Sequence, residues 1–353
     1  MRCLPVLSSL AFSWSLGTAL DAPAFHPAMD SDVTKTFTMS AAFQLDDFSL
    51  DVDGQDMGAM MGAFELSLDA ETAVTVRDTY LATAQGRPER LKRAFDALKS
   101  SSTFSIVAGG ESQEQPFEAS SKLEGRTVSF TWNEQEGAFD VAFEGEEGDT
   151  DLLDGLDEEM DLRFFLPQGD VSVGDTWEVA VDSLLPLVMP GGDLAFESPE
   201  DADDEAAQMI EEFLEGKAEE LKDLLHGTCT CTYKGSSEVG GVQLGEIQIA
   251  LEIASAADLS PLIEEAIQRI AEENGETEVP VDVRAADVNL DVQGTGTLLW
   301  DLRAGRLHSL QMQGDCQIAL DVSISVDENG QSHSANLSAE LSGTLEETVE
   351  ASE

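Results

Sequence analysis

The chain has 353 residues, of which 71 are acidic and 18 are Lys or Arg, so its formal net charge is −53 at pH 7. Nucleic acid and anionic membrane surfaces carry the same sign of charge, so this composition argues against both as partners and favours cations, basic partners or a saline medium. At 42% hydrophobic residues the chain can bury the core of one large or two ordinary domains.

The N-terminus has the pattern of an export signal. Arg2 precedes an apolar run over residues 4–16, and the small residues Gly17, Thr18 and Ala19 follow it. This order is typical of a signal peptide cleaved near Ala19, and the run is too short for a membrane-spanning helix. We therefore expect a signal peptide at residues 1–19, a linker at 20–31 and a mature protein that is periplasmic or extracellular.

Residues 32–185 are expected to form a β-rich N-terminal half. Apolar and polar residues alternate over 33–45, again over 64–80, and in a hairpin over 128–143. A first helix is predicted after Gly86, with Pro88 at its start and a buried stripe of Leu91, Ala94, Phe95 and Leu98. A short helix is also predicted over residues 152–160.

Two further helices are predicted in the second half of the chain. Residues 186–227 contain a linker rich in Pro and Gly, followed by an acidic amphipathic helix that Ser198 caps. Residues 228–347 are expected to form a β-meander with a helix inserted from Ser260 to Asn274, and residues 348–353 an acidic tail. The chain is thus divided into a β-rich half, a helical connection and a second β-rich half.

The strongest strand signal runs from Leu310 to Val326, where every even position is apolar or small. Asn329-Gly330 is the preferred sequence for a type I′ hairpin turn. A two-residue turn there would pair the following residues: Ile324 with Ala335, Val322 with Leu337, and Ile318 with Leu341. A three-residue loop at Gly305 would place Leu298 opposite Leu310 and Trp300 opposite His308.

These elements predict an α+β fold that is mainly antiparallel β. We expect a curled meander sheet or half-barrel, with three helices packed on its apolar face. Whether the two halves form one sheet or two domains is left open.

One resemblance rests on turn and strand motifs in the later half of the chain. Leu166-Pro167, the motif Gly174-Asp175-Thr176-Trp177, the run from Gly294 to Asp301, and Gly305 together resemble uncharacterised secreted bacterial β-sheet proteins of unknown function. Those proteins are loosely similar to the lipoprotein-carrier half-barrels. The resemblance implies an antiparallel sheet curled around helices, and it implies no activity and no site residue.

Three groups of residues are candidate sites. Trp300, His308, Leu310 and Met312 lie on the expected apolar face and are candidates for binding an apolar ligand. Arg87, Arg90 and Arg93 concentrate scarce positive charge; they would bind an anion or partner, or would pair with the protein's own acidic surface. Cys316 forms a disulfide with Cys229 or Cys231, or all three are buried thiols.

The sequence gives little support to catalysis. It contains four His and no nucleophile elbow, phosphate-binding loop or metalloprotease motif. A calcium loop starting at Asp51 would need an acidic residue at its twelfth position, which is Gly62. We therefore expect no catalytic residue, no metal and no cofactor.

The function expected from these observations is that of a secreted, non-enzymatic protein that binds an apolar small molecule between sheet and helices. The alternative is an acidic structural or interaction protein of the cell envelope, which binds cations or a basic partner. A hydrolase ranks third.

Overall fold

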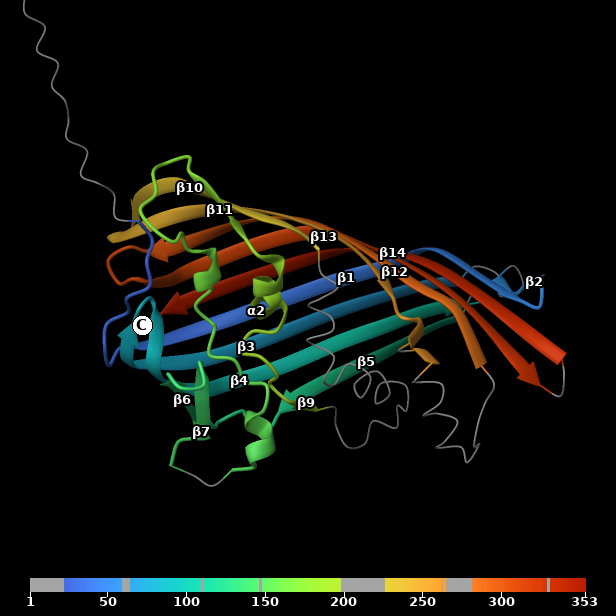
Figure 1. Ribbon diagram of the computed structural model, residues 1–353, viewed down its shortest axis with the longest axis horizontal. Coiled ribbons are helices and arrows are strands. Elements are labelled where there is room, and N and C mark those ends of the chain that lie inside the picture. Colours follow the sequence, from blue (N-terminus) through green and yellow to red (C-terminus); the bar gives the residue numbers. More distant parts are fainter. Residues whose placement is uncertain are drawn as a thin grey trace, which may run out of the picture.

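The computed structural model describes residues 22–58, 64–108, 111–145, 148–197, 226–261, 263–264, 281–328 and 331–353. About 70% of these residues lie in strands, and the strands form one antiparallel sheet (Figure 1). Its order is β7-β6-β4-β3-β1-β14-β13-β12-β11-β10-β8. The long strands are β1 (Asp32–Val52), β3 (Phe64–Ala84), β4 (Arg87–Ala108), β10 (Gly227–Val239), β11 (Val242–Asp258), β12 (Val281–Asp301), β13 (Arg306–Glu328) and β14 (Gln331–Ser352). The shorter ones are β2 (Gln55–Asp56), β5 (Glu111–Ser121), β6 (Thr127–Asn133), β7 (Ala138–Phe143), β8 (Thr176–Val179) and β9 (Phe196–Glu197).

The first and last long strands are neighbours at the middle of the sheet. β1 pairs with β14 over almost its whole length, with Phe37 opposite Val349 and Met39 opposite Glu347. The two halves of the chain therefore share one sheet. The expected acidic tail at 348–353 belongs to β14 as far as Ser352 and contributes Val349 and Ala351 to the core.

One face of the sheet, which we call the inner face, carries the core. Strict alternation sends Phe37, Leu298, Leu310 and Val349 to this face, and each is at most 1% exposed. Residues 148–197, which we call the cover segment, lie across it. Figure 1 shows this green segment crossing in front of the strands from β7 to β10, while the strands continue beyond it towards β2.

The cover segment is mostly irregular. It contains the 3₁₀ helices η1 (Thr150–Leu153), η2 (Arg163–Phe165) and η3 (Val181–Leu184) and one short α-helix, α2 (Leu185–Val188). It buries the following side chains against the sheet: Met160, Leu162, Phe165, Leu184, Leu187 and Leu194.

The expected α+β fold with three packed helices is wrong, and the first helix shows why. Residues 87–108 form strand β4, in which Leu91, Arg93 and Phe95 alternate to the inner face. A bulge opposite Thr75 and Val76 then shifts the alternation, so Leu98 also points inward. Positions 91, 95 and 98 therefore share a face in both a helix and this bulged strand, and the buried charge of Arg93 hid the two-residue period.

The other predicted helices are tested only in part. The acidic helix of 198–225 lies outside the described residues, as do Leu262 and residues 265–274 of the third helix. Ser260, Pro261, Ile263 and Glu264 are helical, which agrees with the predicted start. The short helix predicted over 152–160 is wrong, because only the 3₁₀ turn η1 forms there.

The hairpin predictions are largely confirmed. β13 and β14 pair Ile324 with Ala335, Val322 with Leu337 and Ile318 with Leu341. Leu298 lies opposite Leu310 as expected, but Trp300 lies opposite Leu307 and not His308. A bulge between Leu299 and Trp300 leaves His308 as the extra residue.

No helix in the described part of the chain is long and apolar enough to cross a membrane.

Candidate functional site

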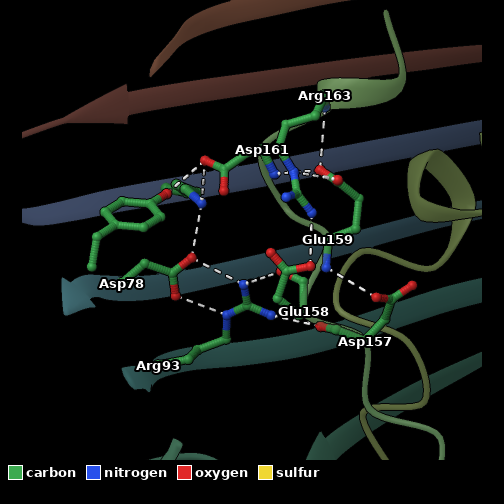
Figure 2. A network of polar contacts seen from close by, with 9 residues as sticks. Asp78, Arg93, Asp157, Glu158, Glu159, Asp161 and Arg163 are labelled. Carbon is green, nitrogen blue, oxygen red and sulfur yellow. Dashed lines mark hydrogen bonds and ion pairs between the residues drawn. The ribbon is translucent and has the colours of Figure 1, made fainter. Parts of the chain in front are cut away.

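A buried ionic cluster joins the cover segment to the sheet (Figure 2). Asp78 on β3 and Arg93 on β4 are cross-strand neighbours. Arg93 donates from Nε to Asp78 Oδ1 at 2.8 Å and from Nη2 to Asp78 Oδ2 at 2.9 Å. Neither side chain is exposed, so this is a bidentate ion pair within the core.

Lys35 on β1 extends the cluster to Asp161 of the cover segment. Its Nζ lies 2.8 Å from Asp78 Oδ2 and 2.7 Å from Asp161 Oδ1. The Tyr80 hydroxyl donates to the same Asp161 oxygen at 2.6 Å. Burial raises the pKa of Tyr80 well above its ordinary value, as do the neighbouring carboxylates of Asp161 and Asp78. Tyr80 therefore stays a hydrogen-bond donor at physiological pH.

Arg163 holds the outer part of the cluster. It donates from Nη2 to Glu158 Oε2 at 2.7 Å and from Nε to Glu159 Oε2 at 2.6 Å. Arg93 reaches the same loop by donating to the carbonyl oxygens of Asp157 and Glu158, both at 2.8 Å. Burial raises the pKa of Glu158 to about 8; Glu159 and Asp161 add repulsion, and Arg163 opposes the change.

This cluster has a structural role: it attaches the cover segment to the sheet. Its cations and carboxylates face each other across β1, β3, β4 and the cover segment, and Lys35, Asp78, Arg93 and Asp161 are fully buried. Burying such charges costs free energy unless each meets a partner of opposite charge, and each carboxylate here meets a cation. Glu158 Oε1 and Asp161 Oδ2 are left without a hydrogen-bond partner among the described residues. The ion pairs hold the cover segment in one position. That position defines the space beside it.

The candidate functional site is an apolar cavity next to α2 on the inner face. It has a volume of about 280 Å³. The sheet supplies its floor and α2 supplies Leu187 and Val188. Besides two glycines, the remaining residues that line it are Met39, Ser40, Ala41, Ala70, Thr72, Leu251, Val292, Met312, Gln313, Leu345, Glu346 and Glu347.

Two glycines create the space. Gly294 on β12 and Gly314 on β13 lie directly opposite each other, and both line the cavity. Because neither has a side chain, the floor is hollow at the point where two side chains would otherwise project inward. Ala41 and Ala70, opposite each other on β1 and β3, keep the neighbouring floor shallow.

Among the described residues, Glu347 is the acidic side chain on the inner face that lines this cavity, whereas Glu346, which also borders it, is exposed. Glu347 is 8% exposed, and its Oε1 atom is buried without a hydrogen-bond partner among the described residues. Burial alone raises the pKa of Glu347 to about 8. A carboxyl group in this setting is largely protonated at neutral pH, and it can form a further hydrogen bond with a polar group of a ligand.

The predicted ligand residues are only partly brought together. Met312 lines the cavity. Trp300 and Leu310 are fully buried in the core, and Trp300 Nε1 donates to the carbonyl of Ala24 at 3.0 Å. His308 is half-buried at the bulge beside the Gly305 turn. Trp300 and Leu310 therefore serve the core.

Sequence reasoning missed Glu347, although a signal was present. Leu345, Glu347 and Val349 occupy successive inward positions of one strand, so a charge interrupts an apolar stripe. Lys35 between Val33 and Phe37 carries the same signal. Neither residue was given a role from the sequence, because the partner strands were unknown.

Arg87, Arg90 and Arg93 do not form one patch. Arg93 is buried in the ionic cluster, and the Arg87 guanidinium stacks 3.6 Å from the centre of the Trp132 ring. Arg90 is exposed. The neighbouring Lys92 pairs with Glu144 at 2.6 Å. Pairing with the protein's own carboxylates thus accounts for Arg93 and Lys92.

Cys229, Cys231 and Cys316 are buried free thiols. Cys316 on β13 is separated from β10 by two intervening strands, which corresponds to a distance of about 14 Å at the usual strand spacing. A disulfide requires Cα atoms within about 7 Å. The geometry therefore rules out the disulfide alternative, and the three sulfurs pack as small apolar groups.

No protein-family model matches this chain, and no curated protein matches it.

Proposed function

We propose that the protein is a secreted, non-enzymatic binding protein that holds an apolar molecule in the cavity between α2 and the inner face. The observation that carries the proposal is the cavity itself, with a largely aliphatic lining and a volume of about 280 Å³. This volume lies just below the range of about 300–1,000 Å³ for small-molecule sites. The expected ligand is correspondingly small, with a short hydrocarbon portion.

The construction of the cavity favours binding. Its floor consists of strands that are hydrogen-bonded on both sides, and the ionic cluster fixes the cover segment, so little ordering is needed when a ligand enters. Leu187 is 6% exposed and Val188 is 61% exposed. α2 therefore presents one residue to the core and one to the rim, where a ligand would contact it.

Export and the resemblance to carrier half-barrels agree with this proposal. A protein released from the cytoplasm with an apolar cavity could move a poorly soluble molecule through an aqueous compartment. The signal peptide expected at 1–19, on which export rests, lies outside the described residues.

Native mass spectrometry of the mature protein purified from its source tests this function. The result expected is an added mass that organic solvent extracts as an apolar molecule. A mass equal to that of the polypeptide alone, unchanged after incubation with lipids of the source envelope, would contradict the proposal. It would favour the alternative of an acidic interaction protein of the envelope.

A further inference from the structure

The surroundings of Glu347 restrict the kind of molecule that the cavity can hold. Met39 on β1 and Met312 on β13 lie directly opposite Glu347 in the two neighbouring strands. Leu345 and Val349 flank it on the same face of β14. These four neighbours are thioether and aliphatic side chains that donate no hydrogen bond. Of the polar residues that line the cavity, Thr72 pairs with Ser100, and none donates to Glu347 Oε1 among the described residues.

The described lining of the cavity contains no Lys, Arg or His. This distinguishes Glu347 from every carboxylate of the ionic cluster, where each acid meets a cation. A buried carboxyl with an unsatisfied oxygen is costly to the folded protein. A ligand that brings hydrogen-bond donors and a positive charge would remove that cost.

We propose that Glu347 recognises a hydrophobic amine, whose ammonium group pairs with the carboxylate while its hydrocarbon portion fills the apolar cavity. This inference rests on the proposed function, because it names the ligand class of the same cavity. A fatty acid fits poorly, since its carboxylate would find no cation in the described lining and would be repelled by Glu347. A neutral alcohol would satisfy one hydrogen bond but leave the charge pair unmade.

The proton balance of this binding step is defined. At neutral pH the protonated Glu347 loses its proton to solvent as the ammonium ion binds, and the product is a carboxylate paired with an ammonium. The cation itself keeps all its protons. Binding is therefore coupled to the release of up to one proton, and affinity rises with pH until Glu347 is ionised without ligand.

The net charge of the protein supports the same choice. With 71 acidic and 18 basic residues, the chain attracts cations and repels anions from a distance. This long-range field falls with added salt, whereas the buried pair at Glu347 is screened much less.

Isothermal titration calorimetry with three matched probes tests the inference: octylamine hydrochloride, octanol and sodium octanoate. The eight-carbon chain is short enough to suit a small cavity. At pH 8 we expect octylamine to bind the wild-type protein most tightly and octanoate most weakly. E347Q should weaken octylamine binding by about 30-fold or more and change octanol binding by less than about twofold.

Two variants control for indirect effects. E350Q removes the same charge from the exposed outer face of β14 and should leave all three affinities unchanged. E347D keeps the carboxylate and should retain a preference for octylamine over octanol at lower affinity. Thermal unfolding of each variant without ligand establishes that the cavity is intact.

The pH dependence of octylamine binding is a second test of the role of Glu347. Between pH 6 and pH 7 the octylamine affinity of the wild-type protein should rise about tenfold, and titrations in buffers of different ionisation enthalpy should report nearly one proton released per ligand at pH 7. E347Q should show neither effect.

The outcomes separate the two proposals. If no octyl probe binds, the proposed function fails and the inference fails with it. If octanol and octylamine bind equally to wild-type protein and E347Q, the apolar site stands and the role of Glu347 is overturned.

Discussion

Asp78 and Arg93 face each other across β3 and β4 as a fully buried, bidentate ion pair. Such pairs usually lie on the solvent-exposed face of a sheet. Here the pair lies beneath the cover segment, and Lys35 forms a second ion pair with Asp78. The pair therefore links sheet pairing to the docking of the cover segment, and the cavity depends on both.

Removing one carboxylate of this cluster should destabilise the protein strongly. D78N leaves Arg93 and Lys35 without their shared partner in the core, so we expect a loss of about 3–5 kcal/mol in the free energy of unfolding. Urea denaturation monitored by tryptophan fluorescence measures this loss. D96N is the matched control, because it removes a carboxylate that pairs with Arg77 at the surface, at 3.1 Å. Its expected cost is below about 1 kcal/mol, and equal costs for D78N and D96N would contradict the account.

Stability should decrease as the pH rises from about 5 to 8. Glu158 and Glu347 both have pKa values raised to about 8, from an ordinary value of 4.5, so the folded state binds more protons than the unfolded state across this interval. Their contribution is complete below pH 4.5 and is lost as the pH passes 8. Between pH 5 and pH 8, Glu347 should lower the free energy of unfolding by an amount on the order of 3 kcal/mol.

Urea titrations at fixed ionic strength from pH 5 to pH 9 measure this dependence. E347Q should remove the contribution of Glu347, so the free energy of unfolding should fall less steeply with pH. E350Q should leave this slope unchanged. At lower pH a different group acts: against the effect of its burial, Arg93 and Lys35 hold the pKa of Asp78 below its ordinary value. Acid therefore destabilises the cluster. A wild-type profile that E347Q does not change would contradict the assignment of Glu347 as an unpaired buried acid.

The three described cysteines should react only after unfolding. Cys229, Cys231 and Cys316 are at most 3% exposed, and burial raises the pKa of Cys316. We expect iodoacetamide to leave all three unmodified in the folded protein and to alkylate all three in denaturant without reductant. Peptide mapping by mass spectrometry reads each site. A peptide in which Cys316 is cross-linked to Cys229 or Cys231 would show that the sheet order is wrong.

The ease of predicting the fold differed sharply between its parts. The β13–β14 hairpin was predictable in register because a long apolar alternation and an Asn-Gly turn agree. The pairing of β1 with β14 was not, because residues about 300 positions apart in the sequence meet in it and no local pattern records which strands are neighbours. Strand β4 was mistaken for a helix because a buried Arg93 reads as surface until its partner Asp78 is known.

From the sequence we could predict that the apolar face of the sheet is covered, but not where the cover leaves a cavity. Its hollow depends on Gly294 lying opposite Gly314 on the neighbouring strand and on the position of α2, whose Leu187 is buried in the core. Met312 was identified on the correct face. Glu347 was assigned to the meander without a role, because an acidic residue near a chain end ordinarily points to solvent.

The most direct test of the central claim fills the cavity and asks whether binding disappears. A41F places a phenyl ring in the cavity from the inner face of β1, and A42F places the same ring on the outer face of the same strand. Octanol, which needs no charge partner, is titrated calorimetrically into the wild-type protein and both variants. The account predicts saturable binding by the wild-type protein and A42F and none by A41F; equal binding by all three would contradict it.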